Sequence, residues 1–411
     1  MNLVARIINA PLYPLAYAHE EMLSFGSYMK NLGKKPIVHF EQPYEGQNIL
    51  LLALYEKGWI RADIEKLLII AKQLGMYVLV VNTLKIPKPE ALKDNIDCYI
   101  ERVNFGRDFG SYQTGFLHLY KNGWDKICDR LLMANDSIFF AQEHLQSFMQ
   151  NMIYTNKDIL GATDNYQYEH HLGSFFISLR NNILRAKKFR KYWIKYRKTN
   201  IRPKVIQRGE LGLSRVLKKI SADGKLHALF DVVFYVEKLE ESEKFKAILN
   251  SLQSESKGMK MPRISLAELL SEIIEKQIYS LSVELKNSEY DVFLISEAQD
   301  IKTALAKITK NKPTSGQVIN VEKYIKARLA GLFDNGSKIH QNSLPLLICG
   351  CPIIKLDLLY RGVIGEKDLL AISEILFHEE RIYFLKNLFE RPFGLSNYRA
   401  LNKVKFARGL I

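Results

Sequence analysis

The sequence predicts an α/β fold with a largely parallel β-sheet and a mainly helical C-terminal region. Short apolar segments alternate with segments of helical pattern through about residue 180. One apolar segment, residues 76–81, is unbroken, which is typical of a strand covered by helices on both faces. After residue 180 the pattern becomes helical and rich in charge, which predicts helices in much of the remaining chain.

The elements of the sheet domain follow in order along the chain. We expect strands at residues 35–40, 76–81, 96–103, 130–134, 159–163 and 174–179. We expect helices at residues 60–75, 111–120, 142–152 and 180–196. The first of these helices has apolar residues at helical spacing. It ends at Gly75, because glycine adopts the left-handed backbone that follows many helices.

Three segments divide the 411 residues. We expect a helical or irregular lead-in at residues 1–35, the α/β domain at 36–238 and a mainly helical region at 239–411. Within the third segment, residues 239–278 have a helical pattern and residues 291–296 form a further strand candidate. A chain of this length divides into two or three domains at about 100–200 residues per domain.

The composition indicates a globular protein that binds anionic partners. The formal net charge is +15 and hydrophobic residues make up 47% of the chain, which excludes a disordered or fibrous protein. No run of about 18 apolar residues predicts a membrane-spanning helix. Arg6, Pro11 and Pro14 interrupt the N-terminal apolar stretch, so we expect no signal peptide and a cytoplasmic protein. Four scattered cysteines predict buried thiols rather than a disulfide framework.

The positive charge is concentrated in two stretches. Residues 180–208 hold twelve Lys and Arg with no Asp or Glu, and residues 391–411 hold five more. The first stretch also contains the aromatic residues Phe189, Tyr192, Trp193 and Tyr196. Basic and aromatic side chains together suit an anionic bilayer or a lipid diphosphate. The alternative is a solvated helix face whose aromatic residues are buried.

Polar residues follow the predicted strands, where open parallel sheets bind their ligands. The first group is residues 104–112, NFGRDFGSY. Gly106 and Gly110 allow close approach of a ligand to the backbone, and Arg107 offers a planar donor that matches a diphosphate. Asp108 can accept hydrogen bonds from sugar or ribose hydroxyls. The alternative is a turn with a structural Arg–Asp pair.

Two further polar groups follow later strands. They are Asn135, Asp136 and Ser137 after one strand, then Asp164 after the next, with His170 and His171 beyond it. A carboxylate at a strand end can hold a divalent cation, and a histidine there can contact phosphate or sugar, or act as a base. For each group the alternative is a local turn or a packed side chain.

In this order, the groups resemble the rhamnan synthesis protein F family of bacterial polysaccharide glycosyltransferases. The matching segments are residues 104–112, 132–137, 161–164, 171–176, 209–214 and 351–355. The resemblance implies a GT-A-like, Rossmann-type sheet. It also implies transfer of a hexosyl or deoxyhexosyl group from a nucleotide sugar to a cell-surface polysaccharide, such as the O-antigen of lipopolysaccharide, a capsule or a rhamnan.

The resemblance further implies roles for individual residues. The donor is expected to contact Asn104, Gly106, Arg107, Asp108, Asn135, Asp136 and Ser137. The expected catalytic residues are Asp164, Glu210 and His171, with Asp164 preferred as base, and the expected phosphate contacts are Lys355 and His170. A single carboxylate, Asp136, stands where GT-A enzymes carry Asp-x-Asp, so Mg²⁺ or Mn²⁺ and the donor itself are alternative ligands there.

The implied partners are a lipid-linked oligosaccharide acceptor, other polysaccharide-assembly enzymes and the anionic inner face of a bacterial cytoplasmic membrane. We expect no nucleic acid among them, and we expect the C-terminal region to support the acceptor side. The alternatives are a nucleic-acid-binding protein and a noncatalytic scaffold of an assembly complex. The enzymatic reading requires that one cavity gather Arg107, Asp108, Asp136 and Asp164.

Overall fold

The computed structural model describes residues 12–239, 330–331, 333–334, 336–364, 366–389 and 398–410. The strand predicted at residues 291–296 lies outside these residues, and so does all but the first residue of the helical segment predicted at 239–278. Part of the basic tail, residues 391–397 and 411, also lies outside them. All the polar groups singled out at the predicted strand ends lie within the described residues.

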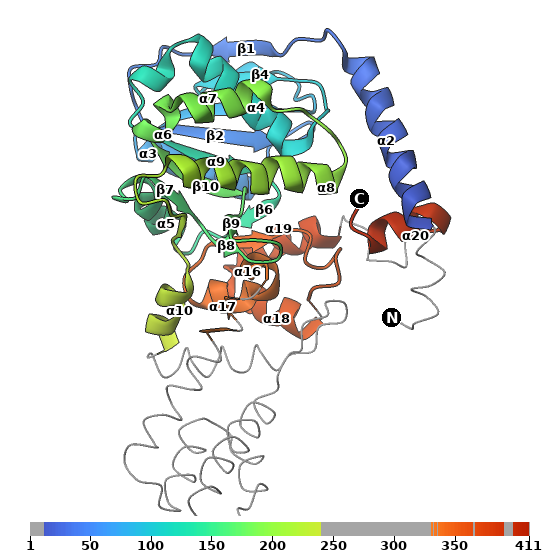
Figure 1. Ribbon diagram of the computed structural model, residues 1–411. Coiled ribbons are helices and arrows are strands. Elements are labelled where there is room, and N and C mark those ends of the chain that lie inside the picture. Colours follow the sequence, from blue (N-terminus) through green and yellow to red (C-terminus); the bar gives the residue numbers. More distant parts are fainter. Residues whose placement is uncertain are drawn as a thin grey trace, which may run out of the picture.

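An eight-stranded mixed sheet forms the centre of the molecule (Figure 1). Its spatial order is β1 (Ile37–Glu41), β4 (Cys98–Glu101), β3 (Tyr77–Asn82), β2 (Ile49–Leu54), β5 (Arg130–Asn135), β10 (Phe176–Arg180), β7 (Ile159–Gly161) and β11 (His227–Ala228). Strands β4, β3, β2 and β5 run parallel, as do β7 and β11, whereas β1 and β10 run antiparallel to their neighbours. The predicted α/β fold with a largely parallel sheet is confirmed.

The strand at the centre of the sheet, β2, is one to which the sequence analysis assigned no element. It lies between β3 and β5, and all six of its residues are buried. Its sequence, ILLLAL, has no polar residue, because both faces of a central parallel strand are covered. The same reasoning that predicted β3 therefore applies to β2.

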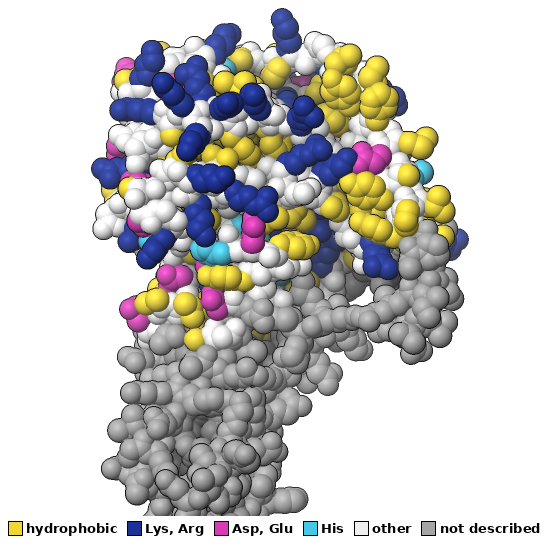
Figure 2. All heavy atoms as spheres, viewed as in Figure 1, with side chains coloured by type: hydrophobic (Ala, Val, Ile, Leu, Met, Phe, Trp, Pro, Cys, Tyr) yellow, Lys and Arg dark blue, Asp and Glu magenta, His cyan; other side chains and the backbone are white. Residues whose placement is uncertain are grey.

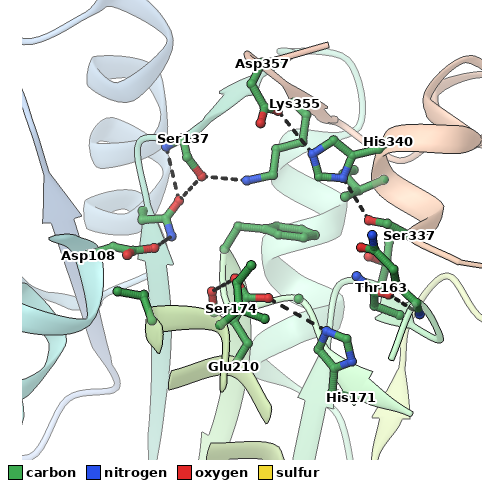
Figure 3. Close-up of a pocket in the computed structure, with 18 of the residues that line it drawn as sticks. Asp108, Ser137, Thr163, His171, Ser174, Glu210, Ser337, His340, Lys355 and Asp357 are labelled. Atoms are coloured by element: carbon green, nitrogen blue, oxygen red, sulfur yellow. Dashed lines mark hydrogen bonds and ion pairs between the residues drawn. The ribbon is translucent and has the colours of Figure 1, made fainter. Parts of the chain in front are cut away.

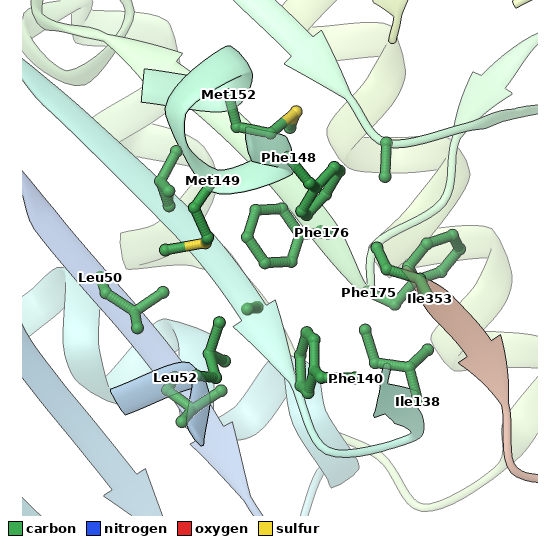
Figure 4. Packing of buried hydrophobic residues seen from close by; sticks show 14 of the residues in the cluster. Leu50, Leu52, Ile138, Phe140, Phe148, Met149, Met152, Phe175, Phe176 and Ile353 are labelled. Carbon is green, nitrogen blue, oxygen red and sulfur yellow. The ribbon is translucent and has the colours of Figure 1, made fainter. Parts of the chain in front are cut away.

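Helices cover both faces of the sheet, and alternate residues of β2 contact each layer. Leu50 and Leu52 belong to a cluster that includes residues of α3 (Ala62–Gln73) and α5 (Leu145–Ile153), part of which Figure 4 shows. Ile49, Leu51 and Ala53 belong to a second cluster. That cluster includes residues of α4 (Arg107–Lys121), α7 (Lys187–Lys195) and α9 (Gly212–Ile220).

The aromatic residues of the basic stretch belong to this second cluster. Phe189 and Trp193 are fully buried and Tyr196 nearly so, and the ring centroids of Trp193 and Phe116 are 4.6 Å apart. Their predicted contact with a bilayer is therefore wrong, because their rings lie in the core between α7 and α4. The solvent-facing side of α7 carries basic residues and Ile194 instead.

The described part of the C-terminal region is helical, and it completes the core of the sheet domain. Strand β12 (Ile353–Lys355) pairs antiparallel with β6 (Ile138–Phe140), and Ile353 lies in one cluster with Phe140 (Figure 4). Around this pair stand the helices α16 (Lys338–Gln341), α17 (Ser343–Ile348), α18 (Glu366–Ile375) and α19 (His378–Phe389). The β6–β12 pair carries C-terminal residues to the strand ends of the sheet.

The expected lead-in contains a long helix, α2 (Leu12–Asn31), which packs on α20 (Ala400–Ala407) near the other end of the chain (Figure 1). The buried Lys405 joins them, since its Nζ lies 2.6 Å from Oε1 of Glu20. Among the described residues, no helix combines the length and the apolar character needed to cross a bilayer.

Candidate functional site

A cavity of about 270 Å³ lies where strands β5 and β7 end (Figure 3). Both strands point their carboxyl ends at it, because β5 ends at Asn135 and β7 is followed by Thr163 and Asp164. The first turn of α4 supplies Arg107 and Asp108 to its wall. Three further segments complete the cavity: the short strand β9 (His171–Leu172), the segment formed by α8 (Arg202–Val205) and the π-helix η3 (Ile206–Leu211), and the C-terminal residues around β12.

A buried arginine fixes the loop that leads into α4. The Arg102 guanidinium donates hydrogen bonds to Ser111 Oγ at 2.8 Å and to the carbonyl oxygen of Phe105 at 2.7 Å. It also donates to the carbonyl oxygen of Arg107. Burial lowers the pKa of Arg102 to about 10, and the carbonyl groups satisfy its donors. The positions of Arg107 and Asp108 therefore depend on a residue outside the cavity.

Gly106 is required at the start of α4. Its φ of 94° is left-handed, and an added Cβ would lie 2.9 Å from Cβ of Lys198. Its N–H donates to Asn200 Oδ1 at 2.8 Å, and Arg107 Nε donates to the carbonyl oxygen of Asn200 at 2.9 Å. Gly106 thus lets this loop pack closely against residues 198–200, and the helix begins at Arg107 rather than at the predicted residue 111.

A continuous hydrogen-bonded chain crosses the cavity from Asp108 to Lys355 (Figure 3). Asn135 Nδ2 donates to Asp108 Oδ2 at 3.1 Å. Ser137 Oγ donates to Asn135 Oδ1 at 2.5 Å, and Lys355 Nζ donates to Ser137 Oγ at 2.8 Å. Lys355 reaches this position because it pairs with Ile138 in the register of β12 and β6.

Two carboxyl groups in the cavity have pKa values shifted in opposite directions. Burial, and then the charge of Glu210, raise the pKa of Asp108 above its usual value. Burial alone would also raise the pKa of Glu210, but hydrogen bonding to His171 and the charge of Lys355 lower it below its usual value. A pair of this kind makes one carboxylate, Asp108, the stronger proton acceptor and keeps the other, Glu210, ionised over a wider pH range.

His171 orients Glu210. Its ring lies with Nε2 3.7 Å from Glu210 Oε2, while Nδ1 donates to the carbonyl oxygen of Glu169 at 2.6 Å. Burial would lower the pKa of His171, but Glu210 and the Glu169 carbonyl raise it, so the imidazolium form is favoured. Ser174 Oγ donates to the other oxygen of Glu210 at 3.4 Å.

Asp164 lines the same cavity, but both of its oxygens accept hydrogen bonds from basic side chains. Oδ1 accepts from Lys338 Nζ at 2.5 Å and Oδ2 accepts from His170 Nε2 at 3.1 Å. Lys338 has no exposed surface and also contacts Asp334 at 2.7 Å. Burial would raise the pKa of Asp164, but His170 and Lys338 lower it. Such a carboxylate is a weak proton acceptor.

Asp136 is not among the residues that line the cavity. Its Oδ2 accepts a hydrogen bond from the N–H of Tyr55, and Arg61 Nη1 donates to its carbonyl oxygen at 2.8 Å. Among the described residues, no group of three His, Cys, Asp or Glu ligands includes Asp136. This donor set does not fit Mg²⁺ or Mn²⁺, which take several oxygen ligands, and the metal-binding role of Asp136 stays a prediction.

The structure thus brings together most of the predicted site residues. Arg107, Asp108, Asn135, Ser137, Asp164, His171, Glu210 and Lys355 line the cavity. Of the others, Asn104 is exposed, Gly106 supports the loop, and His170 contacts the cavity only through Asp164.

Further charged residues that the sequence analysis did not single out also line the cavity. They are Arg202, His340, Asp357 and Arg361. Asp357 accepts from His340 Nε2 at 3.1 Å and lies 3.5 Å from Arg361 Nε. Asp357 lies in the turn that follows β12, so strand alternation does not extend to it and no spacing rule singled it out.

Comparisons with known proteins add a family to this geometry. The family model described as Rhamnan synthesis protein F matches residues 77–298, more than half of the chain. A protein of Sinorhizobium fredii named "Uncharacterized protein y4gN" is 27% identical over 188 residues, which are 44% of this chain and 48% of that protein. The virulence protein VirA of Vibrio anguillarum is 35% identical over 79 residues, 19% of this chain and 24% of that protein.

The chain therefore matches about half of the first curated relative and about a quarter of the second. Among solved structures, the glycosyltransferase GlyE of Streptococcus pneumoniae TIGR4 aligns with a TM-score of 0.27 and 14% identity, over 50% of this chain and 52% of that chain.

Proposed function

This chain belongs to the rhamnan synthesis protein F family, and on that premise we propose that it is a glycosyltransferase of polysaccharide synthesis. It transfers a hexosyl or deoxyhexosyl group from a nucleotide sugar to a lipid-linked oligosaccharide. The observation that carries the proposal is the cavity itself, which is lined by four Lys and Arg side chains and by a pair of carboxyl groups whose pKa values are shifted in opposite directions.

The cationic side of the cavity suits the leaving nucleoside diphosphate. Glycosyl transfer places growing negative charge on the diphosphate, which fixed cations stabilise in a site with little water. Arg107, Arg202, Lys355 and Arg361 line the cavity. Lys355 is held by Ser137 and lies 5.1 Å from the centre of the Phe175 ring. These four side chains are proposed to bind the diphosphate and to stabilise its negative charge.

Asp108 is the proposed base for the acceptor hydroxyl. A carboxylate with a raised pKa accepts a proton in the transition state more readily than one with a lowered pKa. Asp108 meets this condition, whereas Lys338 and a hydrogen bond to His170 lower the pKa of Asp164. Glu210, ionised and oriented by His171, is proposed to bind sugar hydroxyls and to stabilise positive charge on the ring. Asp164 is proposed to hold the C-terminal region in place.

A membrane surface is the proposed location of the acceptor. The solvent-facing side of α7 carries Lys187, Lys188, Arg190, Lys191 and Lys195. Figure 2 shows Lys and Arg spread over the face that carries α7, with hydrophobic side chains gathered along the edge formed by α2. Each Lys or Arg near an anionic bilayer contributes about 1 kcal/mol.

Helix α2 supplies the apolar part of this surface. Its exposed large side chains are 45–73% exposed, and they are Leu15, Met22, Leu23, Phe25, Tyr28 and Met29. The helix carboxylates are neutralised, since Glu20 pairs with Lys405 and Glu21 with Lys204. Exposed apolar side chains beside a basic face match an anionic bilayer in both chemistry and charge.

A flotation assay with the full chain tests the membrane surface. We expect co-flotation with vesicles that contain phosphatidylglycerol and little with phosphatidylcholine alone. Replacing Met22 and Phe25 by Glu should abolish flotation, whereas Tyr154→Glu should not, although Tyr154 is 71% exposed. If the α2 variant floats as well as the wild-type protein, α2 is not the membrane-binding surface. If the wild-type protein is a dimer that the α2 variant dissociates, the apolar side of α2 is a dimer interface instead.

Ligand binding and transfer test the enzymatic proposal. We expect nucleoside diphosphates and one class of nucleotide sugar to raise the melting temperature, and we expect incorporation of that sugar into a lipid-linked acceptor. Salt-dependent binding of generic oligonucleotides without any nucleotide-sugar effect would favour a nucleic-acid-binding protein. Binding of a nucleotide sugar without transfer of the sugar to any acceptor tested would favour a noncatalytic scaffold.

A further inference from the structure

Three metal-ligating side chains from separate elements converge at the β1 edge of the sheet, outside the cavity. They are Glu41 of β1, Cys98 of β4 and His118 of α4. Figure 1 places β1 and β4 at the top of the molecule, whereas β8 (Asp164–Asn165), β9 and α16 lie in the lower part of the coloured ribbon. This cluster has no part in the proposed transfer reaction.

The fold brings the three residues together by pairing and packing. Glu41 and Cys98 are direct partners in the antiparallel β1–β4 ladder, whose register shifts between Val38 and Phe40. A bulge of this kind re-aims the side chains beyond it. Cys98 is fully buried against α4 residues that include Phe116, and His118 follows on the same helix.

The distances among the three ligand atoms are close to those of a zinc site. His118 Nε2 lies 2.5 Å from Glu41 Oε2, and Cys98 Sγ lies 3.7 Å from that oxygen and 3.8 Å from that nitrogen. Ligand atoms around tetrahedral zinc are separated by about 3.3–3.6 Å, from its usual bond lengths. The two sulfur contacts, at 3.7 and 3.8 Å, are slightly longer than this range, and the hydrogen-bonded Glu41–His118 pair must open to admit the ion.

A fourth ligand is within reach. The Asn122 side-chain amide lies 3.0 Å from His118 Nε2 and 3.5 Å from Glu41 Oε1. A half-turn of this amide exchanges its nitrogen for its oxygen, and a water molecule is the alternative because Glu41 is exposed. Thiolate with imidazole favours zinc over Mg²⁺ or Ca²⁺, which take oxygen ligands.

We propose that Glu41, Cys98 and His118 bind one zinc ion that fastens α4 to the edge of the sheet. Binding releases the Cys98 thiol proton, and His118 binds as the neutral tautomer that carries its proton on Nδ1, so that sulfur, the Nε2 nitrogen and the Glu41 carboxylate oxygen each donate a lone pair to the ion. The proposed role is structural, since the cluster lies outside the cavity. The ion holds α4 in place, and the first turn of that helix carries Arg107 and Asp108.

The same pair of strands offers a matched control. His39 Nε2 lies 3.0 Å from Glu101 Oε2, so this is a second His–Glu pair at the same edge of the sheet, here between β1 and β4, and no cysteine belongs to it in the described residues. Cys128 is a second fully buried cysteine outside the cluster. Variants at these positions remove the same chemical groups without touching the proposed site.

The test is metal content after dialysis of the full chain, first against chelator and then against zinc. We expect about one retained zinc per chain, falling at least tenfold in Cys98→Ser, His118→Ala and the milder Glu41→Gln. Cys128→Ser and Glu101→Gln should retain wild-type zinc. Circular dichroism checks the fold of each variant, and cobalt loading of the unaltered chain should give a thiolate-to-cobalt charge-transfer band.

Zinc at background in the unaltered chain would overturn the proposal, and so would equal zinc in Cys98→Ser and His118→Ala. A cobalt spectrum without the charge-transfer band would also overturn it, and this readout does not depend on any variant folding. Each of these results leaves the transferase proposal standing. A failure to transfer sugar, conversely, leaves the zinc result unchanged.

Discussion

Two carboxylates of the cavity, Asp108 and Asp164, have opposite environments although both follow strands of the same sheet. Burial, and then the charge of Glu210, raise the pKa of Asp108, and the Asn135 amide that donates to it carries no charge to offset them. Asp164 has Lys338 and His170 on its two oxygens, so its pKa is lowered. The same residue type at equivalent strand ends can therefore serve proton transfer in one place and hold the fold together in the other.

The proposed difference between Asp108 and Asp164 is tested most directly by replacing Asp108. We expect Asp108→Asn to lower the transfer rate by about 10³-fold, within the range for loss of a general base. The folded state should be as stable as before or slightly more stable, because a buried carboxylate with a raised pKa costs stability at neutral pH. Single-turnover kinetics and thermal melting measure the two effects, and wild-type turnover in this variant would place the base elsewhere.

The cationic wall next to Asp108 carries the second largest expected effect. Lys355→Met should lower kcat/KM by about 10²-fold, as loss of one charge-stabilising donor does, and it should weaken nucleoside diphosphate binding. Lys93→Met is the matched control, since Lys93 also stands over an aromatic ring, 5.5 Å from the centre of Phe40. Equal effects of the two substitutions would show that Lys355 acts through packing alone.

The pH dependence sharpens the comparison further. The base form of Asp108 is lost as pH falls through its raised pKa, so activity should decline on an acid limb above the ordinary aspartate range. Glu210→Gln removes one cause of the raised pKa, so the limb should move to lower pH, with a rate reduction of about tenfold. An acid limb at the same pH in both proteins would contradict the coupling of Asp108 to Glu210.

Asp164→Asn should give the smallest effect on transfer and a clear loss of stability. Removing one partner of a buried ion pair costs about 3 kcal/mol, and the rate per folded molecule should change by less than about fivefold. Because the pKa of Asp164 is lowered on folding, its stabilisation is present above the unfolded pKa and disappears as pH falls through the folded one. Denaturant titrations from pH 7 to pH 3 check this sign.

A second substitution shows whether the effect of Asp164→Asn comes from leaving the Lys338 charge unpaired or from loss of a catalytic group. Adding Lys338→Met to Asp164→Asn should restore part of the stability, since the unpaired buried cation is then gone. A rate that falls by 10³-fold in folded Asp164→Asn, with or without the second change, would restore Asp164 as the base.

The local sequence pattern predicted the polar residues at the strand ends, but not the residues from distant parts of the sequence that contact them. The groups at residues 104–108, 135–137 and 164 were found because polar residues follow apolar strands, and the sheet topology places them at one edge. Lys338 is 174 residues from Asp164 along the chain, and no spacing rule relates the two. The environment that separates Asp164 from Asp108 therefore could not be predicted from the sequence.

Other differences have local causes. Central β2 has the same apolar pattern as β3 and was within reach of the same reasoning. The aromatic residues of α7 were assigned to a surface because their neighbours are basic, although a helix places residues three or four apart on a common face. Phe189 and Trp193 have that spacing and both face the core.

The pairing of β12 with β6 has a consequence for protein synthesis. A ribosome-bound chain that has exposed only its first 240 residues contains the sheet, Asp108 and Asn135, but not Lys338, Lys355 or Arg361. Such a nascent chain has Arg107 and Arg202 but lacks Lys355 and Arg361, which are two of the four cations that line the cavity. The proposed sugar transfer therefore requires the residues through Arg361 to have emerged, and shorter nascent chains are expected to be inactive.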